Sequence, residues 1–504
     1  MKLFIIQIMA VSLFSTVSGC GGSPASQSPP ENAPDSREAW DAIYIQDSHV
    51  GYFHTKEHVD SGHSPPIIRS EAEMTMSMKR DGQHISLGSK RTSSETLDGL
   101  LVSFREEQQL GPTPVISTGE VKDGKLAIDT RDGDNTTTRS IDLPENTGGP
   151  FAPEHSLTRR PMRPGETRAV RFFEPMVGAL ATETLEAIGL EQVELLNGSE
   201  NLLRIKSTLA IEGQPQPIRG VRWTNEKGDT LKTESTTMRQ ITYRTSKDEA
   251  LRGDAEEPTF DLMRGTIVKL ERPLADARQK SAIRYRVELP AGDPAKLFAV
   301  GPTQQVKATG PHTAEVTVTS LDPEAPACEG AAGAATDDDR QPSGIIQSDD
   351  PRIVEMAREA AGDRSTPGAV AIALEEYVAH KMRDKRSYTI AFASAADVAR
   401  TLEGDCTEHA VLLVALARAA GIPARVAIGL VYSPADRGFA YHMWTEMLLS
   451  GCWVPLDATL GEGRISADHL KLAHSSLTDR EGFASFLPLA EVIGQLKLEV
   501  LEAR

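Results

Sequence analysis

The sequence predicts an α+β protein, in which a large antiparallel β-rich region precedes a C-terminal domain that contains helices. Between residues 40 and 319, short apolar segments alternate with turn pairs such as Asp123-Gly124, a pattern typical of β-hairpins. After residue 348 the pattern changes, and the apolar residues of 367–382 recur at helical spacing. Strands and helices that follow each other in separate runs indicate an α+β organisation.

The length and charge of the chain limit its class. It has 504 residues, which is more than one ordinary domain, and a formal net charge of −18 at pH 7. Such an acidic chain repels phosphate backbones, so we expect no nucleic-acid partner. The predicted parts are a signal segment (1–20), a flexible tether (21–36), a β-rich region (37–255), a small β-sandwich-like module (256–320), a linker (321–348), a helix-containing domain (349–475) and a C-terminal extension packed on it (476–504).

The first residues resemble an export signal. A short basic start precedes a mainly apolar run at 3–14, which is too short to span a bilayer and is typical of a signal peptide. The run is followed by Val17-Ser18-Gly19-Cys20, which resembles the bacterial lipobox, where the new N-terminal cysteine carries a lipid. We therefore expect a lipoprotein anchored to the membrane through Cys20 and facing the periplasm or the exterior. An ordinary secretory signal is the alternative.

The chain has four cysteines, at positions 20, 328, 406 and 452. If Cys20 is acylated and Cys406 stays free, only Cys328 and Cys452 remain to form a disulfide, which export would permit. Because Cys328 lies in a loop-like stretch, we expect two free thiols instead. The sequence has no CxxC pair and no HExxH segment, so we expect no metal and no cofactor.

Two kinds of pattern define the secondary structure. Met74, Met76 and Met78 alternate with polar residues, which predicts a strand with the three methionines on one face. Helices are expected at 351–362 and 367–382, each with proline in its first turn, and a further helix is expected to start at Ser394. His469 and His474 are placed in a helix after these and are expected to be structural, and 484–500 is expected to cover the domain as a helix or strand.

The segment from Gly404 to Ala410 carries the chemistry. Asp405 and Glu408 have the spacing of a capping box, which places Cys406 at the first position of a helix. The helix is apolar almost all round, so it should be buried. Its positive end would stabilise a thiolate, whereas the anionic Glu408 opposes that effect. Taken alone, Cys406 is best explained as a small buried residue.

Two strands that follow supply a base and a carboxylate. If Ser450-Gly451 forms a two-residue hairpin turn, the paired residue numbers sum to 901, and Asp457 lies opposite Trp444. His442 shares the face of Trp444 and is a diagonal neighbour of Asp457. By the general logic of catalytic triads, Cys406 would attack a carbonyl, His442 would move the proton, and Asp457 would fix the His442 tautomer.

Four blocks then resemble the transglutaminase-like core of bacterial proteins, which belongs to the papain-like superfamily. They are Gly404-Asp405-Cys406, the segment 419–426 (AAGIPARV), the segment 442–446 (HMWTE) and the segment 453–459 (WVPLDAT). The resemblance covers roughly 348–463. Met443 and Ala458 depart mildly from the family pattern, in which a small residue often follows the histidine and proline often follows the aspartate.

The resemblance implies a papain-like catalytic domain, with Cys406, His442 and Asp457 as its triad and Trp444 as a wall of the active site. It also implies thioester chemistry on amide bonds of a peptide or protein substrate. Hydrolysis, as in a peptidase or amidase, is slightly favoured over transamidation because no acceptor site is visible. The alternative is a catalytically silent envelope protein that uses its β-rich region to capture a partner.

Overall fold

The computed structural model describes residues 36–80, 83–109, 114–132, 135–213, 217–235, 237–255, 260–290, 292–328, 333–383, 393–478 and 493–504. The chain divides between Arg264 and Gly265 into two compact units. We call them the N-terminal unit, described from Ser36, and the C-terminal unit. The predicted signal segment, Cys20 and residues 21–35 of the tether lie outside the described residues. No helix within the described ranges is both long and apolar enough to cross a bilayer.

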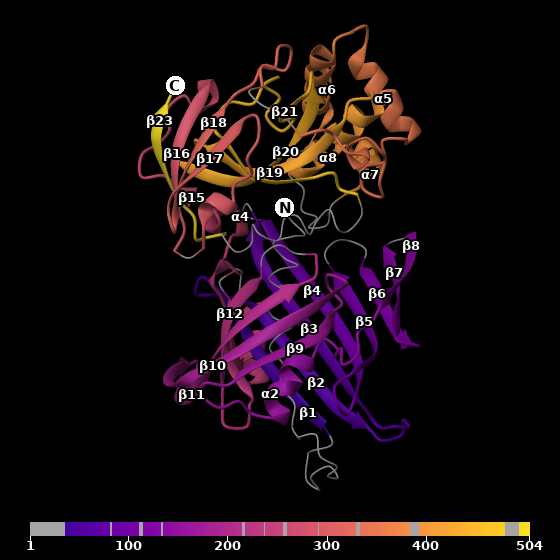
Figure 1. Ribbon diagram of the computed structural model, residues 1–504, viewed down its shortest axis with the longest axis vertical. Helices are drawn as coiled ribbons and strands as arrows, with labels where there is room; N and C mark the ends of the chain where they lie inside the picture. Colours follow the sequence, from indigo (N-terminus) through magenta and orange to yellow (C-terminus); the bar gives the residue numbers. More distant parts are fainter. Residues whose placement is uncertain are drawn as a thin grey trace. The chain divides into compact units, whose positions relative to one another are not determined.

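The N-terminal unit is built on one antiparallel sheet of fourteen strands (Figure 1). In chain order they are β1 (Ser36–Ile45), β2 (Ser48–Asp60), β3 (Ile67–Arg80), β4 (Gln83–Thr96), β5 (Leu101–Gln109), β6 (Val115–Lys122), β7 (Lys125–Asp132), β8 (Asn135–Asp142), β9 (Thr167–Glu174), β10 (Ala179–Leu195), β11 (Gly198–Ile211), β12 (Ile218–Thr224), β13 (Thr230–Ser235) and β14 (Gln240–Thr245). Two meanders, β1–β8 and β9–β14, join where β1 pairs with β14. The expected β-rich region is therefore one continuous sheet.

Local sequence explains the hairpins and the buried face of this sheet. Asp123 and Gly124 both have positive φ and connect β6 to β7, as the turn pair predicts. Met74, Met76 and Met78 are all buried, which confirms the predicted alternation in β3. The helices of this unit are α2 (Ala152–Arg159), α3 (Lys247–Ala255) and α4 (Leu262–Gly265).

The interior of the N-terminal unit combines an apolar core with buried ion pairs. Phe104 on β5 packs against Phe173 on β9 at 5.1 Å between ring centroids, so the two meanders share a core. Helix α2 contributes His155, whose two ring nitrogens lie 2.7 Å from Glu57 Oε1 and 3.0 Å from Glu95 Oε2. These contacts fasten α2 to β2 and β4.

The C-terminal unit holds two smaller sheets. A five-stranded sheet contains β15 (Val268–Lys269), β19 (Ala424–Ser433), β20 (Gly438–Leu449), β21 (Cys452–Leu456) and β22 (His469–Ser475). A four-stranded sheet contains β16 (Ala282–Glu288), β17 (Gln304–Gly310), β18 (Thr313–Thr319) and β23 (Lys497–Ala503). The helices are α5 (Pro351–Ala361), α6 (Pro367–Lys381), α7 (Ala395–Thr401) and α8 (Cys406–Ala419). Figure 1 shows these helices to one side of the five-stranded sheet and the four-stranded sheet to the other.

The organisation of the C-terminal unit differs from the expected division in two respects. The strands expected as a module at 256–320 take their fourth partner, β23, from the C-terminus, and Tyr285 packs edge-on against Phe439 of β20 at 5.6 Å. The expected linker at 321–348 is attached to the domain, since Trp453 Nε1 donates to Gly333 O at 2.8 Å. The terminal extension, where it is described, is a strand of this sheet.

The expectation of two free thiols at Cys328 and Cys452 is wrong. The structure joins them in a disulfide, with their Cα atoms 6.0 Å apart across 124 residues of sequence. Cys452 begins β21, and the bond ties the 321–328 segment to the edge of the five-stranded sheet. Cys406 is the free cysteine of the described chain and is partly exposed.

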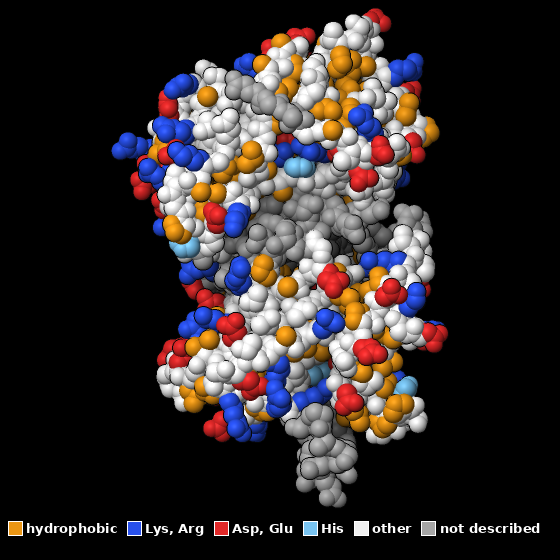
Figure 2. All heavy atoms as spheres, in the orientation of Figure 1, with side chains coloured by type: hydrophobic (Ala, Val, Ile, Leu, Met, Phe, Trp, Pro, Cys, Tyr) orange, Lys and Arg blue, Asp and Glu red, His pale blue; other side chains and the backbone are white. Residues whose placement is uncertain are grey.

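Both signs of charge are interspersed with hydrophobic side chains over the face drawn in Figure 2.

In the interior of the N-terminal unit the charges are paired, and His155 carries a pKa raised to about 10. Burial lowers this pKa, but the carboxylates of Glu57 and Glu95 outweigh burial. His155 is therefore a buried cation at neutral pH.

We predict that His155→Ala destabilises the N-terminal unit by about 3–5 kcal/mol, because it leaves two buried carboxylates without their cation. Urea-dependent hydrogen exchange of β2 and β4 peptides measures the loss. The His155 contribution is fully present below about pH 6.5 and is lost as the pH rises through about 10, so the difference between the two proteins should narrow there. The exposed His58 on the same strand as Glu57 provides the control His58→Ala, and equal losses in both variants would contradict the prediction.

Candidate active site

The start of α8 holds Cys406 in a defined position. Asp405 caps the helix by accepting the Thr407 N–H at 2.9 Å, and Glu408 Oε2 accepts the Asp405 N–H at 2.9 Å. The predicted capping box is confirmed, with Cys406 as the first helical residue. Gly404 precedes it with φ of +150°, and a Cβ there would lie 2.2 Å from the Glu408 side chain. Glycine is therefore required for the chain to enter this helix.

The body of α8 is buried, as the apolar sequence predicts. Every residue from 407 to 418 is buried, and Thr445 of β20 donates to the carbonyl of Ala410 at 3.2 Å. The helix therefore lies against the central strand of the five-stranded sheet. This packing fixes where the Cys406 end of the helix lies relative to β20.

The hairpin of β20 and β21 has the predicted register. Ser450 and Gly451 have φ values of 49° and 82°, as a two-residue turn of the I′ kind requires. Leu449 pairs with Cys452, and the pairing continues without a shift to Thr445 opposite Leu456. Asp457 follows directly after the last paired residue.

The structure brings His442 and Asp457 into contact. His442 Nε2 lies 2.7 Å from Asp457 Oδ2, and both side chains are buried. Asp457 Oδ1 accepts the Thr459 N–H at 2.9 Å. Cys406 also acts on His442, since its charge and side chain raise the pKa of the imidazole. The three residues named by the sequence therefore belong to one interacting series, Cys406–His442–Asp457.

The charges of this series support one another. Burial lowers the pKa of His442, but the charges of Asp457 and Cys406 and the hydrogen bonds to them raise it well above its usual value. Burial alone would raise the pKa of Asp457, yet the charge and hydrogen bond of His442 hold it well below its usual range. His442 is therefore an imidazolium and Asp457 a carboxylate at neutral pH.

A second histidine, which the sequence reasoning assigned to a helix, lies at this site. His469 begins the strand β22 instead of lying in a helix, and its Nε2 is 3.4 Å from the same Asp457 Oδ2 that His442 contacts. Its Nδ1 is 2.8 Å from Asp468 Oδ1. The alternation of 469–472 (HLKL) was a signal for a strand. His474, further along β22, has a pKa lowered to about 4 by burial and the cations around it.

Trp444 lies behind the histidines. It is 2% exposed, and its ring centroid is 6.4 Å from that of His442 and 5.3 Å from that of His469. Gly429 on the neighbouring strand makes room for it, because a Cβ there would come within 2.8 Å of the indole. Trp444 thus supports the imidazoles from within the core, and its role as a wall toward substrate stays a prediction.

The same cluster has the composition of a metal site. His442, Asp457 and His469 place one candidate ligand atom each within 4.8 Å of one another. A metal ion would require both imidazoles in their neutral form. The pKa of each imidazole is raised, so each holds a proton that the Asp457 carboxylate accepts. This chemistry favours a hydrogen-bonded network over a metal centre, and the expectation of no metal stays a prediction.

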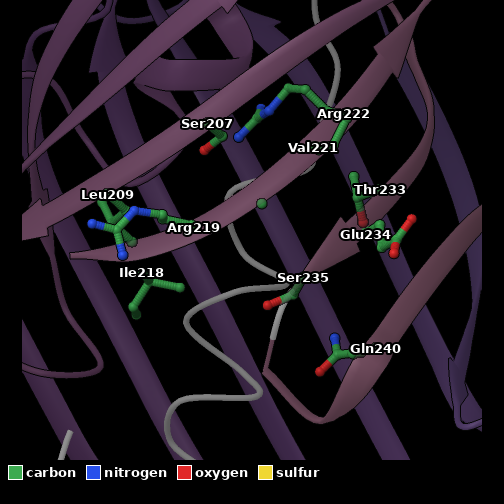
Figure 3. Close-up of a pocket in the computed structure, with 11 residues that line it drawn as sticks. Ser207, Leu209, Ile218, Arg219, Val221, Arg222, Thr233, Glu234, Ser235 and Gln240 are labelled. Atoms are coloured by element: carbon green, nitrogen blue, oxygen red, sulfur yellow. The ribbon is translucent and has the colours of Figure 1, made fainter. Parts of the chain in front are cut away.

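The N-terminal unit also contains a pocket, on β11, β12 and β13 (Figure 3). Figure 3 shows the Arg222 side chain extending toward Ser207. Both residues hydrogen-bond Glu183 Oε1, so their polar groups already have partners. The described residues that line the pocket include neither cysteine nor histidine. Among its described lining residues, the pocket therefore has no counterpart to the cysteine and histidine that the C-terminal unit brings together.

Comparison with solved structures finds similar proteins of low identity. A proposed cysteine protease from Cytophaga hutchinsonii is 17% identical with a TM-score of 0.27, and the match covers 44% of this chain and 86% of that one. The periplasmic domain of TgpA from Pseudomonas aeruginosa bound to ethylmercury is 17% identical with a TM-score of 0.22, over 37% of this chain and 93% of that one. No curated protein matches the chain. At these scores the likenesses carry no argument about activity.

The family comparison falls on the site itself. Residues 354–458 match the family model described as the transglutaminase-like superfamily. The matched segment begins within α5 and ends one residue after Asp457, so it contains Cys406 and His442 as well. This chain therefore carries a C-terminal domain of the transglutaminase-like superfamily, preceded by a large antiparallel β-sheet unit.

Proposed function

We propose that the C-terminal unit is a cysteine-dependent enzyme with a papain-like core, and that it forms a thioester at Cys406 with amide groups of peptides or proteins. The series Cys406–His442–Asp457, in which His442 Nε2 lies 2.7 Å from Asp457 Oδ2 and Cys406 raises the pKa of His442, is the observation that carries the proposal. It combines a partly exposed thiol at a helix N-terminus with a buried, charged imidazole, and these are the parts that nucleophilic catalysis by cysteine requires.

Each group has one task in the proposed reaction. The Cys406 thiolate attacks the amide carbon, and a tetrahedral intermediate forms. Its oxyanion can accept a hydrogen bond from the Cys406 backbone N–H at the helix start. His442 gives its proton to the nitrogen as the C–N bond breaks, which leaves a thioester and a free amine. A water molecule then gives a proton to His442 and attacks the thioester, so that a carboxylic acid leaves and the thiolate returns. Asp457 keeps the His442 tautomer and stabilises its charged form.

Hydrolysis is the proposed outcome, and transamidation is the alternative, in which an amine replaces water in the last step. Both use the same thioester, so the triad does not distinguish them. Water is present at far higher concentration than any amine. A scaffold that only binds a partner would not need the charge pairing of His442 and Asp457, which makes silent binding the weaker alternative.

We propose that the enzyme acts in the cell envelope as a lipoprotein. The lipobox-like segment that ends in Cys20 supports this. The disulfide between Cys328 and Cys452 supports export independently, because such bonds persist in oxidising compartments. The full chain would then present the C-terminal unit to peptides or proteins of the envelope.

We predict that Cys406 reacts rapidly with iodoacetamide near pH 6 and that His442→Ala slows this reaction by roughly 100-fold. A thiol of ordinary pKa is under about 1% ionised at that pH, whereas a thiol paired with an imidazolium is largely ionised. Peptide mapping by mass spectrometry measures the rate at Cys406 in the full chain. His474→Ala, which removes a neutral imidazole from β22, should react like the wild type. Equal slow labelling in all three proteins would reject the enzyme proposal.

A second prediction separates water from amine as the acceptor. We expect the wild type, incubated with a peptide mixture in ¹⁸O-labelled water with an added primary amine, to place ¹⁸O in new carboxylates. Mass spectrometry reads both products, and Cys406→Ala should give neither of them. Amine adducts in excess of ¹⁸O products would assign the protein to transamidation instead.

The anchor has its own test. We predict that the mature chain begins at Cys20 with acyl groups attached, and that Cys20→Ser moves the protein from the membrane fraction to the soluble fraction. A lipid chain contributes about 0.8 kcal/mol per buried CH₂, so its loss removes most of the membrane affinity. Mass spectrometry of the mature N-terminus provides the measurement. An unacylated N-terminus at another residue would refute the lipobox.

A further inference from the structure

The site contains a second imidazole that the proposed triad does not use. His469 is 4% exposed and lies between two carboxylates, Asp457 on one side and Asp468 on the other. Its ring also meets Trp444 edge-on, at an interplanar angle of 84°. The orientation of His469 is therefore fixed by contacts on three sides.

The hydrogen bonds continue beyond His469. Asp468 Oδ1 accepts from Ser466 Oγ at 2.7 Å, and Asp468 Oδ2 lies 3.5 Å from Arg278 Nε, in the 3₁₀ turn at 277–279. From His442 to Arg278 the charges alternate as imidazolium, carboxylate, imidazolium, carboxylate and guanidinium. With the Cys406 thiolate at its head, the series is electrically neutral. Without the His469 charge it would hold one uncompensated buried anion, which is costly.

We propose that His469 is a positioning residue of the reaction, an imidazolium held between Asp457 and Asp468 that keeps the Asp457 carboxylate charged and directed at His442. The inference rests on the proposed function and deepens it, since His469 acts through Asp457 and does not touch the substrate. The cysteine–histidine–aspartate triad becomes the outer part of a longer charged series that ends at Arg278.

The pKa directions agree with this arrangement. Burial lowers the pKa of His469, but the charge of Asp468 and the hydrogen bonds to Asp457 and Asp468 raise it. The pKa of Asp468 is lowered, because the charge of His469, its hydrogen bond and the charge of Arg278 outweigh the effect of burial. Each member of the series thus favours the charged form of its neighbours.

Another acidic side chain is influenced by Asp457. Glu375 of α6 is 1% exposed. Its pKa is raised to about 8 by burial and by the charge of Asp457, so it is neutral at pH 7. The negative charge of Asp457 keeps Glu375 protonated. In the proposed arrangement, the positive charge of His469 in turn keeps Asp457 ionised.

The other charged groups around His469 are also accounted for. Glu462, partly buried in the same turn, has a pKa raised by burial, with Arg278 and His469 opposing that rise. Lys471, two residues along β22, is paired with Glu446 of β20 at 2.6 Å. These neighbours leave Asp457 and Asp468 as the two carboxylates in direct hydrogen-bond contact with His469.

The sign of the electrostatic effect follows from charge alone. Removal of a nearby cation makes neighbouring groups hold their protons more tightly, so the pKa of His442 rises. A plot of thiol reactivity against pH has two limbs. The acid limb reports formation of the thiolate beside the charged His442, and the alkaline limb reports loss of the His442 proton. Loss of the His469 charge should therefore move both limbs to higher pH. A structural role alone would lower the rate at every pH without this common shift.

The decisive variant is His469→Gln in the full chain. The glutamine amide keeps an N–H donor near the place of Nε2 but carries no charge. We expect the pH profile of Cys406 alkylation by iodoacetamide, measured by peptide mapping, to shift upward by about one pH unit at both limbs, since the His442 and His469 ring centroids lie 6.1 Å apart. His474→Gln removes an uncharged imidazole from the same strand and should leave the profile where it is.

The outcomes separate this inference from the proposed function. If His442→Ala removes the enhanced reactivity but His469→Gln leaves both limbs in place or moves them downward, the positioning role is overturned and the enzyme proposal stands. If His442→Ala has no effect, the proposed function fails first. If His469→Gln does not fold, Arg278→Gln decides, since Arg278 is partly exposed. A smaller upward shift in that variant supports the charged series, and an unmoved profile overturns it.

Discussion

The register of β20 in the five-stranded sheet is the constraint on which the site depends. One edge of β20 pairs with β19, placing His442 opposite Gly429, and the other edge pairs with β21, which brings Asp457 next to that histidine. Thr445 on one face contacts α8 through Ala410, while Trp444 on the opposite face packs against the His469 ring. A slip of one residue would exchange these two faces. Cys406, His442 and Asp457 would then no longer meet.

The parts of the site that follow local rules could be predicted from the sequence. Ser450-Gly451 specifies a two-residue turn, and that turn fixes the register as far as Asp457. Asp405 and Glu408, three residues apart, specify the helix start and so the place of Cys406. In each case the residues that determine the geometry are close together in the sequence, so no knowledge of the tertiary fold was needed.

The parts that were missed depend on contacts over long sequence distances. The disulfide joins residues separated by 124 positions, and no short pattern around Cys328 indicates its partner. β23 pairs with β16 across more than half of the C-terminal unit, so the expected module at 256–320 could not be assigned to the same sheet as the C-terminus. His469 was expected in a helix, although the alternation of 469–472 indicates a strand. Its partners Asp457 and Asp468 become visible as a pair only once β22 is aligned beside β19.

The same physical solution recurs in both units, since each buries cations between two carboxylates. Arg91 lies between Glu106 and Glu174 in the N-terminal unit, at 2.5 Å from each, and His155 lies between Glu57 and Glu95. These clusters join α2 and distant strands of one curved sheet. In low dielectric an unpaired charge is far more costly than a well-paired one, so such clusters favour one arrangement of the strands over others.

At the proposed active site this electrostatic arrangement would serve the proposed chemistry as well as packing. The helix N-terminus favours a thiolate at Cys406, but the Glu408 carboxylate that completes the capping box lies one turn away and opposes it. The helix start therefore exerts two opposing influences on Cys406, and the proposed mechanism depends on the cation of His442 instead. His442 is itself buried, and it keeps its charge because Asp457 stays ionised beside it. Since Asp457 is buried as well, its ionisation requires a counter-charge other than the proton that His442 moves during the reaction. His469, which stays paired with Asp468 throughout, can supply that charge at every step.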